Sequence, residues 1–329
     1  MTRRSLLLGT LLAGCSRRNP GPAPIPVRMA VGGRTQWIYL SATLAGVLGY
    51  FDDEGLAVTL QDFPGGAKSL EALLGGSADV VCGFYDHTVQ MAAQGRELHA
   101  FVAMLRYPGL VAAAGPGVAR IEDLKGKTVG VSAPGSSTHM FLNYLLATHG
   151  MKPDDVSTAS IGMGSTAVGA MTHAKVDAAI MTDPSLAIVR KQTPTLRILA
   201  DTRSAEGVRS VFGVDVYPSV VLYSTAPWLA AHRDVAQRLV RALTRTTAWM
   251  RTHPAEEIRK RMPAEFRTED AEADLEGLRT AQAMLSLDGR ITRESAAAVL
   301  KVLSVSLDGV RTASIDLSKT YTDEFLASQ

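Results

Sequence analysis

The stretch Ala72-Leu73-Leu74-Gly75-Gly76-Ser77-Ala78-Asp79-Val80-Val81-Cys82 decides the fold, because a similar stretch recurs further along the chain. An apolar helical run ends at a glycine pair, and an acid then opens a short apolar strand. About a hundred residues later, Ala170-Met171 stands before Asp177-Ala178-Ala179-Ile180, with the same spacing from alanine to acid. The chain therefore carries an internal duplication.

Around each copy, strands and helices are expected in one shared order. In the first copy apolar strands are predicted at 27–31, 56–60 and 79–82, with helical patterns at 37–48 and 67–74 between them. The second copy predicts strands at 128–131, 156–161 and 177–180 and helices at 137–148 and 165–173. Strands that alternate with helices of this length indicate parallel sheets with helices on their faces. The expected fold class is therefore α/β, with two duplicated βαβαβ lobes.

The segments 102–114 and 220–224 predict two antiparallel crossings between the lobes, which together form a hinge near 113–118 and 214–219. Two-lobed proteins are known to close around a ligand by movement at such a hinge. The expected division is a signal peptide at 1–14, a tether at 15–26, lobe 1 at 27–112 plus 218–329, and lobe 2 at 113–217.

Beyond residue 227 the chain is helical, with an apolar stripe through Val235, Leu239 and Leu243. Three arginines, Arg238, Arg241 and Arg245, lie on the opposite face of that helix. Two interpretations stay open for them: a solvated face, or contact with a membrane partner.

The first residues predict export and lipidation. Arg3 and Arg4 precede the apolar run 5–12, which is too short to span a bilayer. Leu12-Ala13-Gly14-Cys15 then resembles a bacterial lipobox, so we expect cleavage before Cys15 and acylation of its thiol. The alternative is a chance cysteine in an ordinary N-terminus. Whether export is general secretory or twin-arginine stays open.

Prolines at every second position of 20–26 keep the tether extended, because proline cannot continue a helix or an inner strand. With Cys15 acylated, the other cysteine, Cys82, has no disulfide partner and is expected to be a buried structural thiol.

The composition excludes a nucleic-acid binder. The chain has 34 basic and 32 acidic residues, and loss of Arg3 and Arg4 with the signal leaves 32 of each. Proteins that bind nucleic acid need a basic surface, and 6% aromatic residues offer no base-stacking platform. With 46% hydrophobic and 20% charged residues the chain is globular, and we expect a monomer.

Four strand–helix junctions carry small or hydroxyl residues, at 32–37, 65–69, 133–138 and 162–166. Ligands of open α/β sheets bind outside the carboxyl ends of the strands, where these junctions lie. A helix N-terminus favours negative charge, and hydroxyl groups there add donors. The junctions therefore predict an anion site in the cleft between the lobes; the alternative is that the serines only cap their helices.

Two further segments follow the third strand of each lobe, Phe84-Tyr85-Asp86-His87 and Thr182-Asp183-Pro184. Aromatic rings there could stack on an organic solute and His87 could donate a hydrogen bond, or Asp86 and His87 could be solvated loop residues. Trp37 is either a wall of the cleft or a core residue of its helix. The expected ligand-binding residues are Arg34, Thr35, Gln36, Trp37, Gly65, Gly66, Phe84, Tyr85, His87, Gly135, Ser136, Ser137, Thr138, Asp183 and Tyr217.

Catalytic motifs are weak. Zinc-protease, hydrolase and phosphate-loop patterns are absent from the sequence. Gly162-Met163-Gly164-Ser165-Thr166-Ala167 fits a dinucleotide pattern, but at the second junction of its lobe rather than the first. Ser136 and His139 could form a nucleophile and its base, but the sequence indicates no third residue that would complete a catalytic triad. We therefore expect no enzyme activity, no cofactor and no metal.

Several segments resemble one family. Gly49-Tyr50-Phe51-Asp52-Asp53-Glu54-Gly55-Leu56, the stretch 66–79, Leu124 to Val131 and Ile315 to Tyr321 are similar to motifs of the nitrate/sulfonate/taurine-type periplasmic binding proteins. That family includes binders of thiamine pyrimidine precursors. The likeness runs from about Val27 to the C-terminus.

The resemblance implies a type II periplasmic-binding-protein fold. It also implies a periplasmic solute-binding protein, anchored in the cell envelope by its lipid, that delivers a small anion to the permease and ATPase of an ABC importer. The ligand is expected at the loops matching Arg34 to Trp37, Gly65-Gly66, Phe84-Tyr85 and Gly135 to Thr138. Sulfonate, carboxylate, nitrate and a pyrimidine precursor all stay open as ligands. The competing classes are an exported enzyme on the same scaffold and a sensor domain presented to a membrane kinase.

Overall fold

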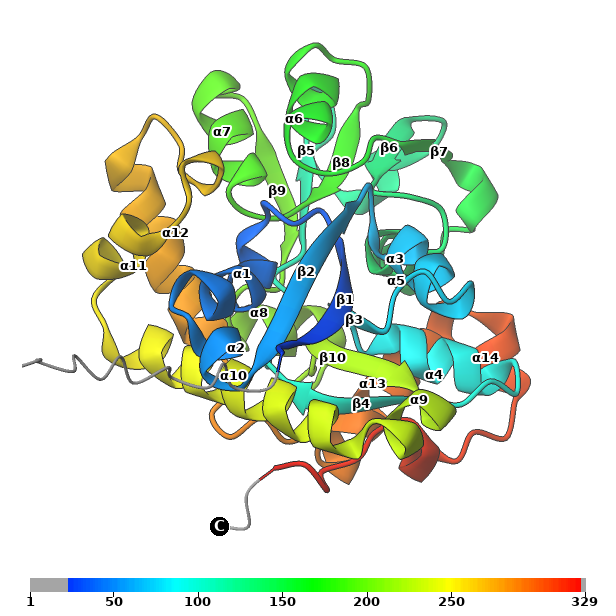
Figure 1. Cartoon of the computed structure of the whole chain (residues 1–329). Coiled ribbons are helices and arrows are strands. Elements are labelled where there is room, and N and C mark those ends of the chain that lie inside the picture. The colour runs from blue at the N-terminus through cyan, green and yellow to red at the C-terminus, as the bar shows by residue number, and fades with distance from the viewer. Residues whose placement is uncertain (1–22, 327–329) are drawn as a thin grey trace, which may run out of the picture.

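The computed structural model describes residues 23–326, whose strands form two five-stranded sheets, and we call the body around each sheet a lobe (Figure 1). The signal peptide and Cys15 lie outside the described residues. The strands of lobe 1 are β1 (Ile25–Gly32), β2 (Leu56–Phe63), β3 (Val80–Phe84), β4 (Leu98–Ala103) and β10 (Val220–Thr225). Those of lobe 2 are β5 (Val111–Ala114), β6 (Thr128–Val131), β7 (Ser157–Ser160), β8 (Ala178–Met181) and β9 (Arg197–Asp201).

The two sheets have the same topology. Their strand orders are β2-β1-β3-β10-β4 and β7-β6-β8-β5-β9. In lobe 1, β1 pairs in parallel with β2 and β3, whereas β10 runs antiparallel to β3 and β4. In lobe 2, β6 pairs in parallel with β7 and β8, whereas β5 runs antiparallel to β8 and β9. The α/β fold with duplicated lobes that the periodicity predicted is confirmed.

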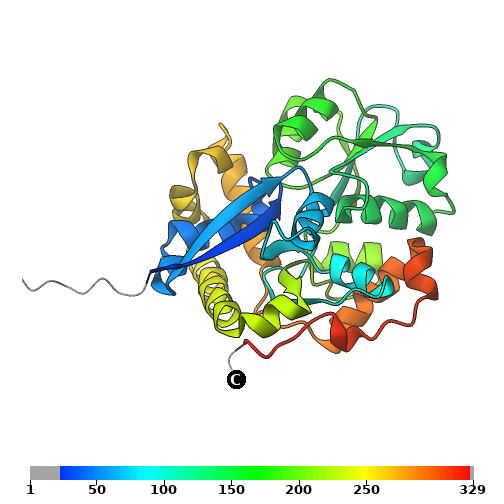
Figure 2. The same ribbon diagram turned by 45° about the vertical axis from the view of Figure 1, so that its right-hand side comes forward.

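Helices cover both sheets (Figures 1 and 2). Lobe 1 contains the short 3₁₀ turn Trp37–Tyr39 and the helices α1 (Leu40–Val47), α2 (Tyr50–Asp53), α3 (Gly66–Leu74), α4 (Asp86–Ala93), α9 (Ala226–Ala231), α10 (Arg233–Thr252), α11 (Ala255–Arg261), α12 (Ala271–Met284), α13 (Arg293–Ser306) and α14 (Asp308–Thr312). Lobe 2 contains α5 (Ser137–Thr148), α6 (Ser165–Thr172), α7 (Ser185–Gln192) and α8 (Ala205–Phe212). Polar side chains cap the N-termini of several helices. The side chains of Asp270 and Thr292 accept hydrogen bonds from the backbone N–H groups of Ala273 and Ser295, in the first turns of α12 and α13.

Helix α10 buries its apolar stripe, including Val235, Leu239 and Leu243, against lobe 1. Its arginines do not simply face solvent. Arg241 pairs with Glu54, and Arg245 pairs with Asp53, so this face is held to the end of α2 by ion pairs.

The chain crosses between the lobes at 104–110 and 213–219. The two crossings are hydrogen-bonded to each other: the N–H of Tyr217 donates to the carbonyl of Arg106, and the hydroxyl of Ser219 donates to that of Tyr107. The hinge expected near 113–118 was misplaced, because the apolar residues of β5 pair with β8 and β9 inside lobe 2. The division of the chain into lobes at 112/113 and 217/218 stays a prediction. The chain passes from one sheet to the other between Ala103 and Val111, and returns between Asp201 and Val220.

One large apolar core extends through lobe 1 into α5 and β6 of lobe 2, and a smaller core lies under α6 and α7. Cys82 lies in the large core as a free, fully buried thiol, and burial raises its pKa to about 12. The prediction of a buried structural thiol is confirmed. Within residues 23–326, none of the helices combines the length and the apolar character needed to cross a membrane.

Trp37 ties the start of lobe 1 to the C-terminal helices. Its indole N–H donates to the carbonyl of Phe266 over 2.9 Å, and its ring lies on α12 where Gly277 has no side chain. A Cβ at Gly277 would stand 2.3 Å from the Trp37 ring. Only glycine leaves room for the indole there.

We predict that Gly277→Ala lowers the free energy of unfolding by about 1–3 kcal/mol, because the added methyl group overpacks the Trp37 site. The matched control is Gly169→Ala in α6, where a Cβ meets no atom within 4 Å. Alanine is a better helix former than glycine, so that variant should gain about 0.5–1 kcal/mol. Urea unfolding of both variants measures the difference, and equal effects would contradict the packing described for Trp37.

Candidate ligand site between the lobes

The carboxyl ends of the parallel strands of both lobes meet at one interface (Figures 1 and 2). Backbone from the two lobes approaches closely there. A Cβ on Gly33 of lobe 1 would lie 2.6 Å from the side chain of Met163 in lobe 2, and one on Gly65 would lie 2.9 Å from the hydroxyl of Ser132. The lobes are therefore closed on each other, and glycines make the closure sterically feasible.

Hydrogen bonds also cross the interface. The N–H of Ala67, in the first turn of α3, donates to Ser136 Oγ over 3.0 Å. Ser137 Oγ, at the start of α5, donates to Asp86 Oδ1 over 2.9 Å. On the other side of the cleft, the hydroxyl of Thr182 donates to the side-chain carbonyl of Gln36 over 2.8 Å. Loops from both lobes thus form one polar interface.

His87 has one ring nitrogen without a hydrogen-bond partner in the described part of the chain. It is fully buried, and its Nδ1 lies 3.3 Å from the hydroxyl of Tyr223. Its Nε2 has no hydrogen-bond partner of good geometry among the described residues. Burial lowers the pKa of the imidazole to about 4, and the nearby backbone of Gly135 opposes that shift. The Tyr223 hydroxyl can donate to Nδ1 or accept from it, and in either tautomer of the neutral ring Nε2 is the nitrogen left without a partner among these residues.

The ring of His87 lies against Gly66, where a Cβ would come within 2.9 Å of Cε1. Gly66 is the first residue of α3, and Gly135 precedes α5. His87 therefore lies between the helix starts of the two lobes.

Asp86 is buried beside His87, with 3% of its surface exposed. Burial raises the pKa of its carboxyl group to about 7, while hydrogen bonds from Ser137 and the backbone of His87 lower it. Among residues 23–326 no cation forms an ion pair with it at 4 Å or less. Burial raises the pKa values of Tyr39, Tyr217 and Tyr223, and the Asp86 charge adds to that shift, so these phenols stay protonated.

Two small cavities adjoin these residues. The first, of about 20 Å³, is lined by glycine backbone, hydroxyls and apolar side chains: Gly32, Ile38, Tyr39, Gly66, Phe84, Leu110, Ser132, Ser136, Ser137, Thr138 and Met163. The second, of about 10 Å³, is lined by Phe84, Asp86, Pro108, Leu110, Ser137, Met140, Phe141, Phe212, Tyr217, Val302 and Leu303. Each has room for about one water-sized group. A larger solute requires the lobes to open.

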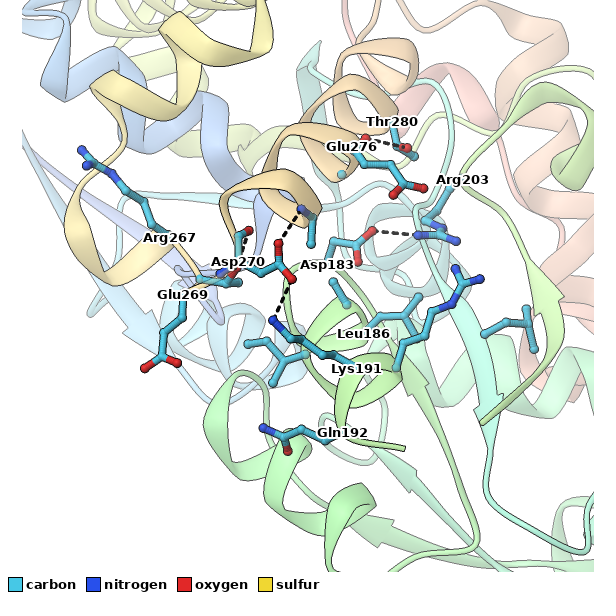
Figure 3. Close-up of a pocket in the computed structure, with 17 residues that line it drawn as sticks. Asp183, Leu186, Lys191, Gln192, Arg203, Arg267, Glu269, Asp270, Glu276 and Thr280 are labelled. Carbon is cyan, nitrogen blue, oxygen red and sulfur yellow. Dashed lines mark hydrogen bonds and ion pairs between the residues drawn. The ribbon is translucent and has the colours of Figure 1, made fainter. Parts of the chain in front are cut away.

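A larger groove, of about 780 Å³, lies at the rim of the interface between α7 and α12 (Figure 3). Lys191 of lobe 2 pairs with Asp270 of lobe 1 across it over 2.7 Å, and Arg203 pairs with Asp183 over 2.9 Å. The charges that face it are thus partly neutralised within the chain. The interlobe cavities are the better candidate site, because the buried ring of His87, whose Nε2 has no hydrogen-bond partner within residues 23–326, packs on Gly66 beside the first of them.

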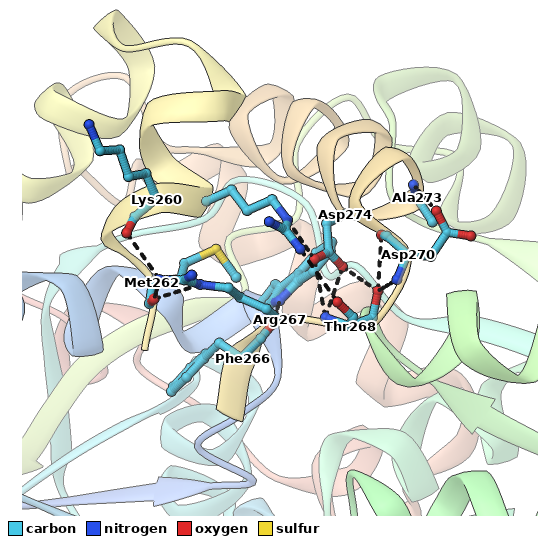
Figure 4. A network of polar contacts seen from close by, with 10 residues as sticks. Lys260, Met262, Phe266, Arg267, Thr268, Asp270, Ala273 and Asp274 are labelled. Carbon is cyan, nitrogen blue, oxygen red and sulfur yellow. Dashed lines mark hydrogen bonds and ion pairs between the residues drawn. The ribbon is translucent and has the colours of Figure 1, made fainter. Parts of the chain in front are cut away.

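The lobe 1 wall of the groove is fixed by a polar network (Figure 4). Asp274 is fully buried, pairs with Arg259 and accepts from the hydroxyl and N–H of Thr268. Thr268 also bonds to the backbone of Asp270, and Arg267 donates to the carbonyl of Met262. This network holds Asp270 where it meets Lys191.

The predicted ligand residues divide into two groups. Gly66, Phe84, Ser136, Ser137, Thr138 and Tyr217 line the two cavities, and Gly65, Gly135 and His87 lie beside them. Thr35 and Gln36 contact lobe 2 at the cleft. The other four do not line the two cavities: Arg34 pairs with Glu265, Trp37 packs on α12, the hydroxyl of Tyr85 bonds to Thr320, and Asp183 lines the groove at the rim, where its carboxylate holds Arg203.

Sequence reasoning did not include Asp86, Tyr39 or Ser132 among the ligand residues. Asp86 had a usable signal, because it lies two residues after the carboxyl end of the buried strand β3. Ser132 likewise follows β6.

The fold and the interlobe cleft define a protein with the periplasmic-binding-protein architecture. Residues 40–257 match the NMT1/THI5 like family, and the chain belongs to that family. The resemblance inferred from the motifs is thereby confirmed.

Solved structures agree over most of the chain. A protein of Bordetella bronchiseptica RB50 is 36% identical, with a TM-score of 0.87, and the likeness covers 92% of this chain and 96% of that one. The alkanesulfonate-binding protein SsuA of Xanthomonas axonopodis pv. citri, solved bound to MOPS, has a TM-score of 0.65 at 19% identity, over 91% and 98% of the two chains. The periplasmic nitrate-binding protein NrtA of Synechocystis PCC 6803 has a TM-score of 0.67 at 14% identity, over 92% and 87%.

One curated relative is named as an enzyme. It is the 4-amino-5-hydroxymethyl-2-methylpyrimidine phosphate synthase of Schizosaccharomyces pombe, which is 30% identical over 128 residues, 38% of this chain. The match spans 36% of the length of that relative.

We predict that Asp86→Asn changes how stability depends on pH. The raised pKa of Asp86 means that its stabilising contribution is present below its ordinary pKa of 3.8 and is lost as pH rises through about 7. Asparagine still accepts from Ser137 but does not titrate. The unfolding free energy of the variant minus that of wild type should therefore rise between pH 4 and pH 8, by at most about 4 kcal/mol. His87 is common to both proteins, so its own titration cancels in the difference measured by chemical denaturation. A constant difference across this range would contradict the burial of Asp86.

Proposed function

We propose that this protein is an extracytoplasmic solute-binding protein that captures a small organic or inorganic anion between its lobes and delivers it to an ABC importer. The observation that carries the proposal is the buried, unpartnered Nε2 of His87 between the helix starts at Gly66 and Ser137. Burial of an unsatisfied polar atom costs free energy unless a ligand provides it with a hydrogen bond.

The surroundings of His87 favour negative charge. The hydroxyls of Ser132, Ser136 and Thr138 line the cavity next to it. The N-terminal ends of α3 and α5 carry partial positive charge. An oxyanion there accepts hydrogen bonds from these hydroxyl groups while the lobes shield it from water.

The relatives support delivery to an importer. The neighbours described above are named as alkanesulfonate-binding and nitrate-binding periplasmic proteins. We extend that role to this chain, with the permease and ATPase of an ABC importer as partners and with the protein acting as a monomer. Export and lipidation at Cys15 would place it in the cell envelope, anchored to a membrane.

A second candidate ligand is a thiamine pyrimidine precursor. The carboxylate of Asp86 can accept a hydrogen bond from an exocyclic amino group, and Phe84 and Tyr217 supply aromatic surface beside it. The relative named as a pyrimidine phosphate synthase favours the same chemistry and also keeps an exported enzyme as a competing class. Conversion of a bound solute into a product would identify an enzyme; saturable binding without turnover identifies a carrier.

We predict that His87→Asn weakens binding of the solute roughly ten- to a hundredfold, because a hydrogen bond to a charged group contributes about 1.5–3 kcal/mol. His87→Gln is the matched control, since its amide reaches the position of Nε2 and keeps a donor there. A thermal-shift screen of sulfonates, carboxylates, nitrate and pyrimidines identifies the solute, because binding raises the stability of the folded protein. Titration calorimetry then compares the variants. Unchanged affinity in His87→Asn would place the anion elsewhere.

We also predict that Cys15→Ser releases the protein from membranes into the soluble fraction, because acyl chains supply the membrane affinity. Fractionation of cells that express each form measures this. If both forms partition alike, the lipid anchor is wrong while the solute site is unaffected.

A further inference from the structure

One ion pair joins the two lobes. Among the ion pairs at 4 Å or less within residues 23–326, only that of Lys191 Nζ with Asp270 Oδ2 connects lobe 2 to lobe 1, over 2.7 Å. It lies on the groove between α7 and α12, and neither residue lines the two small cavities (Figure 3). The pair can therefore act on the position of the lobes without contacting a solute held between them.

The two walls of the groove carry opposite charges. On the lobe 2 wall, Arg203 pairs with acids of its own lobe, which leaves Arg190 and Lys191 as the cations. On the lobe 1 wall, the side chain of the one base, Arg267, donates to the backbone and points away from Lys191 (Figure 3). Opposite charges attract more strongly as the walls approach. The acids of the lobe 1 wall are Glu269, Asp270 and Glu276.

Asp270 is held in place independently of Lys191. Its carboxylate caps α12 by accepting from the N–H of Ala273 over 3.1 Å, and its backbone bonds to the hydroxyl of Thr268, which the buried Asp274 fixes (Figure 4). An exposed ion pair usually contributes little, because two long side chains must be ordered to form it. Here the acid is already ordered, so only the lysine loses freedom when the lobes close.

We propose that Lys191 and Asp270 form a clasp that favours the closed form of the two lobes, whichever solute lies between them. The inference rests on the proposed function for one point, that the lobes open to admit a solute. Because both residues are partly exposed, salt screens their attraction, and closure therefore responds to ionic strength. A contact that favours the closed form raises the apparent affinity of every solute that binds this form by the same factor.

The alternative is an ion pair without influence on the lobes. Many exposed pairs contribute nothing measurable, and Lys191 and Asp270 would then meet only because other contacts have already closed the cleft. The two interpretations differ in one observable, the fraction of molecules in which the lobes are open.

The test measures the distance between the lobes in solution, without a solute, by double electron–electron resonance. Spin labels are attached to two exposed positions, through Ala248→Cys in α10 and Thr158→Cys in β7. The full chain is used, with Cys15→Ser so that the labels react only where intended. Cys82 is fully buried and stays as it is.

The clasp is broken by Lys191→Gln or by Asp270→Asn, and asparagine keeps the cap of α12. The matched control is Lys319→Gln, which removes a lysine from an exposed ion pair inside lobe 1, where it meets Glu97 over 2.9 Å. The double variant of Lys191 and Asp270 completes a mutant cycle, which shows whether the two residues act through each other. Each protein is measured at low and at high salt.

We expect each clasp variant to raise the ratio of open to closed molecules about two- to fivefold at low salt, which is the effect of one exposed ion pair. High salt should raise this ratio in wild type and change it little in the variants. The double variant should match the single ones, and Lys319→Gln should behave as wild type.

An open fraction in Lys191→Gln equal to that in Lys319→Gln overturns the clasp, and so do single effects that add up in the double variant. Both results leave solute capture between the lobes standing, which the thermal-shift screen tests separately. One closed distance in every protein, at low and at high salt, means that the lobes do not open. That result overturns the proposed function together with the clasp.

Discussion

The structure depends on glycines at the strand ends of lobe 1, which pass so close to neighbouring backbone and to side chains of lobe 2 that no side chain could replace their hydrogen. Gly32 faces the backbone of Gly65 and Gly66 so closely that a Cβ would lie 2.5 Å from a peptide nitrogen. Gly65 in turn faces Ser132 of the other lobe, and Gly66 faces the ring of His87. Because these positions carry hydrogen only, the two helix starts can lie opposite each other, and the polar groups of both lobes reach one small volume.

That closeness determines the electrostatics of the site. Water is excluded from Asp86 and His87, so burial moves the two pKa values toward the neutral form of each group. Neutral groups then act through the direction of their hydrogen bonds: Ser137 donates toward Asp86, and Tyr223 lies against Nδ1 of His87. A site built this way discriminates between solutes by where they carry donors and acceptors, because a wrongly placed group leaves a buried partner unsatisfied.

The fold could be predicted from the sequence because local signals and tertiary structure agree in the duplicated units. The helix predicted at 137–148 has those bounds, and the strand predicted at 128–131 has them too. The directions of the side chains at the cleft could be predicted less well from the sequence. Trp37 and Arg34 leave the cleft because Gly277 and Glu265, more than two hundred residues away, offer them a slot and an ion pair. The place of Asp86 after β3 could be predicted, but its hydrogen bond from Ser137 could not, because Ser137 lies 51 residues away in the other lobe.

The position of β10 has a consequence for the order in which the protein can fold. This strand lies between β3 and β4 in the sheet of lobe 1, yet it follows the whole of lobe 2 in the chain. All the strands of lobe 2 lie in one continuous segment, so that sheet can form as soon as the segment is synthesised. The sheet of lobe 1 cannot: β4 has no partner strand there until β10 arrives from beyond residue 219. During synthesis, lobe 1 therefore stays an incomplete sheet with an unpaired edge until β10, which is made after the whole of lobe 2, completes it.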